Sequence, residues 1–202
     1  MIMAAKARGL ILSAATALAP TTTLADFNAE DYAPYEICAL CHGLFGTSRM
    51  SKFPNLAGQD ATYMQNQLEA YLDGTRTNAS GQMKTIVTEI TREDFEIVVD
   101  WFVTQDPPSP IDDGNDPAPG RAIYSDANCG SCHDIADMIP GVPHLTAQHP
   151  AYLTQQMLDF QAGDRLPVRS DIPHIDLLAN LSKDDIQAIA TFLAAKPREP
   201  HF

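Results

Sequence analysis

The sequence Cys38-Ala39-Leu40-Cys41-His42 recurs with the same spacing at Cys129-Gly130-Ser131-Cys132-His133. A Cys-x-x-Cys-His pentad is the attachment signature of c-type haem. The two thiols lie one helical turn apart, so both can add to the vinyl groups of one porphyrin, and the adjacent histidine can bind the iron as an axial ligand. The two pentads use all four cysteines of the chain. We therefore predict two covalently bound c-type haems, with His42 and His133 as iron ligands.

A zinc site built from the four cysteines and a pair of disulfides are the alternative interpretations. Zinc does not require a histidine after each second cysteine. A disulfide within Cys-x-x-Cys usually serves redox chemistry instead of holding a fold together. Haem is the interpretation that uses every residue of both pentads.

Residues 1–25 have the pattern of a cleaved secretory signal. Lys6 and Arg8 give a basic start, and the apolar run at residues 9–19 is too short for a stable membrane anchor. Small residues at Thr23 and Ala25 suit a signal peptidase, so we expect a mature chain that begins at Asp26 and has no membrane span; an uncleaved anchor is the alternative. Because c-type haem is attached outside the bacterial cytoplasm, the expected location is the periplasm.

The chain of 202 residues is acidic, with a net charge of −13 that becomes −15 once Lys6 and Arg8 are removed. Such a chain does not bind nucleic acid or an anionic membrane surface by charge. The acidic residues are spread evenly over both halves, so no single acidic docking patch is predicted. We expect redox protein partners that present a basic docking face.

The chain is an internal duplication. The halves align at an offset of 91 at the pentads, 89 over the middle segment and 91 again before the last helix. Residues 105–119 between them are rich in proline and have no apolar periodicity, which predicts an extended, stiff linker. The predicted domains are residues 26–104 and 120–202. The matched pairs are Pro54 and Pro143, Gln59 and Gln148, Tyr63 and Tyr152, Gly74 and Gly163, Arg76 and Arg165, and Thr91 and Ser182.

The predicted fold class is all-α, because no stretch alternates as a strand over a useful length. In each half a first helix leads into the pentad, over residues 31–41 and 120–132. A second helix follows Tyr63 or Tyr152 and ends at a glycine. A third begins at the capping residue Thr91 or Ser182.

A low-spin c-type haem needs a second axial ligand from a later loop. Met83 lies eight residues before Thr91, and His174 lies eight residues before Ser182. Thioether sulfur and neutral imidazole both bind haem iron, so we predict Met83 and His174 as the second ligands. The competitors in the second half are Met138, His144, His149 and Met157.

Two further matched pairs have candidate roles around the haems. A carbonyl near Pro54 or Pro143 is expected to accept the Nδ1–H of His42 or His133, which fixes the tautomer that presents Nε2 to the iron. Arg76 and Arg165 are candidates for pairing with haem propionates, and ordinary surface arginines are the alternative.

These motifs resemble those of the cytochrome c4 family over essentially the whole mature chain. The resemblance rests on both pentads, Pro-Asn-Leu-Ala-Gly-Gln at residues 54–59, Tyr63, Gly74-x-Arg76 and Met83. It implies two tandem class I cytochrome c domains related by a pseudo-twofold axis, and electron transfer instead of bond-making chemistry. His174 departs from the pattern, because that family ordinarily supplies methionine there.

The leading functional hypothesis is therefore a periplasmic carrier of single electrons. With both axial positions filled at each iron, no substrate can bind the metal, so enzymatic activity by this chain alone is not expected. The second half is also similar to the dihaem subunit of flavocytochrome c sulfide dehydrogenases. A flavoprotein partner subunit is thus the alternative. A thiosulfate-oxidising enzyme with a cysteine-ligated haem is disfavoured, because no fifth cysteine exists.

Overall fold

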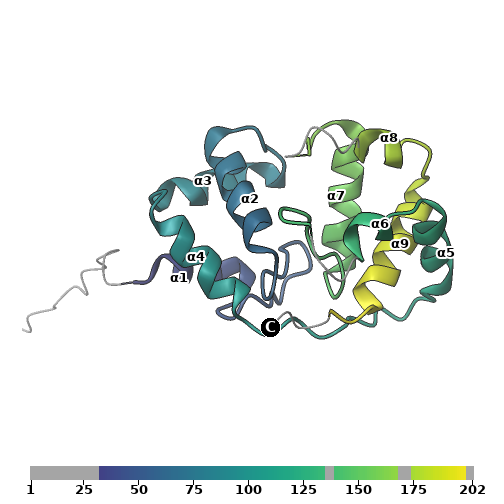
Figure 1. Ribbon diagram of the computed structural model, residues 1–202, viewed down its shortest axis with the longest axis horizontal. Coiled ribbons are helices and arrows are strands. Elements are labelled where there is room, and N and C mark those ends of the chain that lie inside the picture. Colours follow the sequence, from purple (N-terminus) through teal and green to yellow (C-terminus); the bar gives the residue numbers. More distant parts are fainter. Residues whose placement is uncertain (1–31, 135–138, 168–173, 199–202) are drawn as a thin grey trace, which may run out of the picture. The chain divides into compact units, whose positions relative to one another are not determined.

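The computed structural model describes residues 32–134, 139–167 and 174–198 (Figure 1). These residues belong to one compact unit. The predicted signal peptide at residues 1–25 lies outside them. Across the described ranges all regular secondary structure is helical, which confirms the all-α class. No helix within these ranges is long and apolar enough to cross a membrane.

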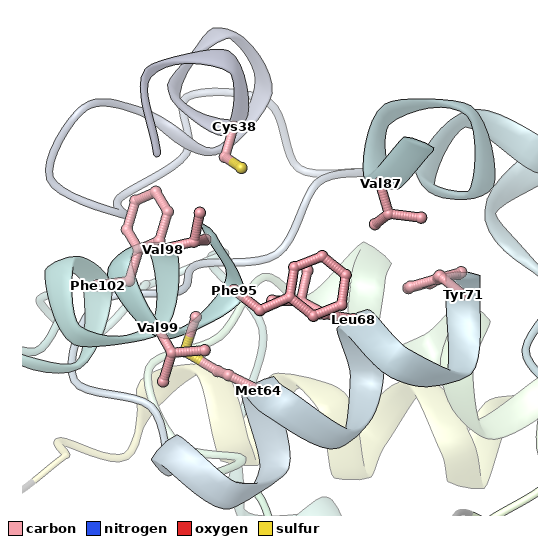
Figure 2. Close-up of a cluster of buried hydrophobic side chains, with 9 residues drawn as sticks. All are labelled: Cys38, Met64, Leu68, Tyr71, Val87, Phe95, Val98, Val99 and Phe102. Carbon is pink, nitrogen blue, oxygen red and sulfur yellow. The ribbon is translucent and has the colours of Figure 1, made fainter. Parts of the chain in front are cut away.

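The N-terminal half packs three helices around one apolar core. Helices α1 (Pro34–His42) and α2 (Ala61–Asp73) both lie against α4 (Asp94–Val103), while α3 (Gln82–Ile86) lies between 3-10 turns at Ala79–Gly81 and Val87–Glu89. Figure 2 shows the buried side chains of this core and includes Cys38 from the first pentad. Its members are Cys38, Met64, Leu68, Tyr71, Val87, Phe95, Val98, Val99 and Phe102.

The C-terminal half repeats this arrangement with its own core. Helices α5 (Ala118–Asp126) and α7 (Pro150–Ala162) pack against α9 (Lys183–Ala195), and α8 (His174–Leu178) packs against α7. The short helix α6 (Gly130–His133) carries the second pentad. The two cores share no residue, although the predicted domain boundaries themselves stay a prediction. The second core consists of Tyr124, Leu153, Ile189, Ala190, Phe192 and Leu193.

The segment between α4 and α5 is held along the C-terminal half. Ile111 N–H donates to the Ala194 carbonyl at 2.8 Å, and the Thr191 hydroxyl donates to Asp113 Oδ2 at 2.8 Å. Helix α5 begins at Ala118, inside the predicted linker, because a proline is tolerated in the first turn of a helix. The segment therefore acts as a packed connection.

The predicted C-terminal ends are correct for the second helix of each half, although each helix begins two residues before the tyrosine that it was predicted to follow. Gly74 and Gly163 end α2 and α7 in the left-handed conformation, at φ 77° and 79°. Ser182 caps α9 through reciprocal hydrogen bonds with Asp185. Thr91 makes the same exchange with Asp94, but a turn intervenes and Glu93 is the residue that precedes α4.

The first helix of each half differs from its predicted range. In the first half, α1 begins at Pro34, since proline favours the first helical position. In the second half the single helix predicted over residues 120–132 is wrong. Helix α5 ends at Asp126, and Asn128 takes φ 53°, a left-handed conformation that asparagine tolerates better than most residues. The second pentad therefore folds as a separate turn of helix.

Candidate haem-binding site

Both pentads line one cavity of about 1200 Å³. Ordinary small-molecule pockets measure roughly 300–1,000 Å³, so this cavity is larger than a typical site for one small ligand. Its lining includes every residue that the sequence predicts as a thioether or iron ligand. These are Cys38, Cys41, His42, Met83, Cys129, Cys132, His133 and His174.

The histidine of each pentad is oriented by one backbone carbonyl. His42 Nδ1 lies 2.9 Å from the Pro54 oxygen, and His133 Nδ1 lies 3.0 Å from the Pro143 oxygen. A carbonyl can only accept, so Nδ1 carries the proton and Nε2 keeps its lone pair. Burial lowers the pKa of both histidines below the ordinary value, so both imidazoles are neutral near pH 7. Each ring is thus in the state that binds a metal ion.

None of the four cysteines forms a disulfide in the described part of the chain. Burial raises the pKa of the Cys38 thiol to about 11 and also raises the pKa of Cys129. No group of three or more histidine, cysteine, aspartate or glutamate side chains in the described ranges is placed to hold a metal ion. The four-cysteine zinc site and the disulfides therefore have no support in the described part of the chain.

The spacing of His133 and His174 matches that of two imidazoles on opposite sides of one metal ion. The ring centroids of His133 and His174 lie 6.3 Å apart. An imidazole nitrogen lies about 2.0 Å from a bound metal ion and about 1.1 Å from its own ring centre, so two opposed rings have centroids about 6 Å apart. His174 begins α8, and its ring stacks on Phe160 at a centroid distance of 4.8 Å. The aromatic contact holds the imidazole beside the second pentad.

Met83 occupies the matching place in the first half. It is the second residue of the short helix α3 and is half-buried against the first core. A backbone turn with Ser80 at φ 52° precedes this helix and places Met83 at the wall of the cavity that His42 also lines. The two predicted second ligands therefore both lie in the first turn of a short helix, α3 in one half and α8 in the other.

The competing ligands of the second half lie in other settings. His149 precedes α7, and its Nε2 lies 3.0 Å from the Ser48 carbonyl of the first half. His144 directly follows Pro143, on the loop that orients His133. Met157 packs partly buried against the second core. Met138 lies outside the described residues.

Arg76 and Arg165 are buried, so the alternative of ordinary surface arginines is wrong. Their exposed fractions are 5% and 7%. Arg76 donates to Gln67 at 2.6 Å within its own half and to Gln156 of the other half at 2.8 Å. Arg165 mirrors this, with Gln156 at 2.8 Å and Gln67 of the other half at 3.3 Å. The two guanidinium groups thus meet across the contact between the halves.

Neither guanidinium group forms an ion pair with a carboxylate within the described ranges. Two buried cations in one place are costly unless anions compensate them. The Nε of Arg165 is buried and has no hydrogen-bond acceptor among the described residues. The site therefore has the charge and a spare donor for an acidic group of a ligand.

Two tyrosines complete this contact. The Tyr63 hydroxyl lies 3.0 Å from Arg165, and the Tyr152 hydroxyl lies 3.4 Å from Arg76, each in the opposite half. Burial works to raise the pKa of Tyr63, but the guanidinium groups of Arg165 and Arg76 outweigh it and lower the pKa below the ordinary value. The lowered pKa reflects the two guanidinium groups that lie beside this hydroxyl.

Three buried residues that join the halves have no role predicted from the sequence. Gln59 and Gln148 each form hydrogen bonds with the backbone of the other half. The only feature of the sequence that pointed to them is that they match each other across the duplication. Arg198 donates to the carbonyls of Ala57 and Thr146, at 2.9 and 2.7 Å. Nothing in the local sequence marks Arg198, because its acceptors lie far away in the chain.

Known proteins are similar to this chain in sequence and in fold. The family model described as cytochrome c matches residues 117–196. A cytochrome c4 from Pseudomonas aeruginosa is 30% identical over 167 residues, which cover 78% of this chain and 82% of the relative. A thiosulfate dehydrogenase electron acceptor from Stutzerimonas stutzeri is 29% identical over 78% of this chain and 77% of its own length. The solved cytochrome c4 structure from Acidithiobacillus ferrooxidans superposes with a TM-score of 0.68 at 25% identity, covering 80% of this chain and 99% of that one.

Proposed function

The chain belongs to the cytochrome c4 family and is a dihaem electron-transfer cytochrome, and we propose that it works in the periplasm with two differently ligated haems. It is an electron carrier and not an enzyme by itself, and it has two covalently bound c-type haems. When bound, each haem supplies a one-electron couple at its iron. The residues of this chain hold the haems and supply their axial ligands.

In this proposal Cys38 and Cys41 attach the first haem, and Cys129 and Cys132 attach the second. His42 and Met83 are the axial ligands of the first haem. His133 and His174 are those of the second, and the observation that carries this assignment is the 6.3 Å between their ring centroids. Both proximal histidines donate Nδ1–H to a proline carbonyl, and this hydrogen bond raises the electron density on Nε2.

Arg76 and Arg165 are proposed to bind haem propionates. The two buried guanidinium groups line the cavity with the pentads and have no carboxylate partner within the described ranges. Arginine presents a fork of donors that matches a carboxylate, and the free Nε of Arg165 is one such donor. Binding there would place acidic groups of the haems at the contact between the halves.

The periplasmic location rests on the c-type pentads and the leader pattern of residues 1–25. Cell fractionation of the native organism tests location and partnership together. A haem-stained band is expected in the periplasmic fraction, at the mass of the chain without residues 1–25. No flavin is expected to co-purify with it. A flavoprotein that co-purifies in fixed proportion would instead support the alternative of a flavocytochrome subunit.

Association with a basic redox partner is expected to weaken as salt is raised. The processed chain carries −15, and steering by such a charge is screened over about 10 Å at 0.1 M salt. Binding of a lysine-rich redox protein, measured at low and high ionic strength, checks this. Salt-independent binding would contradict a basic docking face. It would point to apolar contact through the exposed side chains of Leu40, within the first pentad, and Phe45, which follows it.

The electron donor is proposed to be a dehydrogenase of an inorganic sulfur compound or a quinol-oxidising complex. The first of these is favoured by the relative described as a thiosulfate dehydrogenase electron acceptor, which the chain matches over 78% of its length. Reduction of the purified protein by each class of donor in turn would distinguish them.

A further inference from the structure

A glutamine from each half holds one peptide of the other half by two hydrogen bonds. Gln148 Oε1 accepts from Asn55 N–H at 2.8 Å, and Gln148 Nε2 donates to the Asn55 carbonyl at 2.9 Å. Gln59 does the same to His144, accepting its N–H at 2.7 Å and donating to its carbonyl at 3.0 Å. The two contacts are equivalent under the duplication, because Gln59 aligns with Gln148 and Asn55 with His144.

The N–H that each glutamine accepts belongs to the same peptide group that orients a proximal histidine. The Asn55 nitrogen and the Pro54 carbonyl form one planar peptide group, and that carbonyl lies 2.9 Å from His42 Nδ1. In the other half the His144 nitrogen and the Pro143 carbonyl form the equivalent group, 3.0 Å from His133 Nδ1. A chain of two hydrogen bonds through one rigid peptide therefore joins each glutamine to the proximal histidine of the opposite half.

These glutamines have little freedom to move. Gln148 and Gln59 are 3% and 5% exposed, so water does not replace their contacts. Gln148 Oε1 also accepts from His149 N–H at 3.0 Å, and Gln59 Oε1 from Asp60 N–H at 2.9 Å. Because backbone N–H groups only donate and carbonyls only accept, each amide can point in one direction.

We propose that Gln59 and Gln148 are positioning residues that tune the haem of the opposite half. An N–H that donates to Gln148 polarises its peptide, so the Pro54 carbonyl becomes a stronger acceptor for His42. A stronger acceptor makes the imidazole a more basic ligand, which favours ferric iron and lowers the reduction potential of the first haem. Gln59 acts in the same way through Pro143 on the second haem. Contact between the halves thereby sets both potentials.

Replacement of each glutamine in the haem-loaded chain tests the proposal. Gln148→Met fills a similar volume without an amide, and it is expected to raise the potential of the first haem and leave the second unchanged. Gln59→Met is expected to raise the potential of the second haem only. Gln65→Met is the matched control, because Gln65 lies on α2 and donates to Glu69 of the same helix; both potentials should stay as in wild type.

Amide hydrogen exchange gives a readout that does not depend on the haem potentials. In Gln148→Met the Asn55 amide should exchange several-fold to about tenfold faster, since one buried hydrogen bond is lost. The His144 amide should respond only to Gln59→Met. Gln148→Glu keeps an acceptor for Asn55. Its Asn55 amide should stay slow and the potential of the first haem should not rise, so a raised first potential in this variant would contradict the proposal.

Each glutamine variant is expected to shift the redox step of the haem in the opposite half. This reciprocal effect can be tested separately from the axial-ligand assignment, which serves to say which step belongs to which haem. If the second ligands are assigned wrongly, each variant still moves one redox step and the reciprocal variant moves the other. Equal shifts of both steps, a shift confined to the haem in the same half as the replaced glutamine, or unchanged steps together with faster Asn55 exchange would each overturn the proposal.

Discussion

His174→Met is expected to raise the reduction potential of the C-terminal haem by on the order of 100 mV or more. Thioether sulfur is a weaker donor to ferric iron than imidazole, so methionine ligation favours the reduced state, and axial ligands spread haem potentials over about 0.8 V. In the oxidised spectrum of the variant, the methionine–iron charge-transfer band should also rise to the intensity expected for two methionine-ligated haems. The measurement is a spectroscopic redox titration of the variant beside wild type.

Met157→Leu is the control, because Met157 packs against the second core in the aligned position of Leu68. It should leave both redox steps and the charge-transfer band unchanged. If His174→Met leaves them unchanged as well, His174 is not a ligand. Met138 and His144 would then be the next residues to replace.

The double variant Arg76→Met/Arg165→Met is expected to lower the potentials of both haems. A nearby positive charge favours the reduced iron, and removal of one at a distance of about 10 Å costs roughly 1.7 kcal/mol at an effective dielectric constant of about 20. This corresponds to roughly 70 mV for a one-electron couple. Redox titration of the haem-loaded double variant measures the two shifts.

Arg76→Lys/Arg165→Lys keeps both positive charges but loses the paired donors of each guanidinium group. The reduction potentials of both haems should therefore stay closer to the wild-type values than in the methionine double variant. Arg92→Met removes an exposed arginine that pairs with Glu69 and Asp73, and it should change neither potential. Unchanged potentials in the methionine double variant would show that the guanidinium groups lie outside the electrostatic reach of the haems.

The local features of the fold could be predicted from the sequence. The left-handed ends at Gly74 and Gly163 and the capping box at Ser182 follow from short-range rules, because the residues that decide them are neighbours in the chain. The single helix predicted over residues 120–132 was wrong, and the cause is again a local feature of the chain. The left-handed Asn128 interrupts it, and helical periodicity does not report a single residue of that kind.

The contacts between the halves could not be predicted, because each joins residues about 80 to 140 positions apart. The duplication marked Arg76 and Arg165 as a matched pair, but it did not reveal that both are buried and share Gln67 and Gln156. Nor did it reveal that Gln59 and Gln148 reach across to the other half. Such contacts depend on how two folded halves associate, which no local pattern encodes.

The protein is proposed to hold two unlike haems, with methionine at the first iron and a second histidine at the other. A spectroscopic redox titration of the wild-type protein tests this claim. Two separated one-electron steps are expected, and the methionine–iron charge-transfer band should follow the step of higher potential only. A band with the intensity of two methionine-ligated haems, or one that follows both steps equally, would contradict the claim.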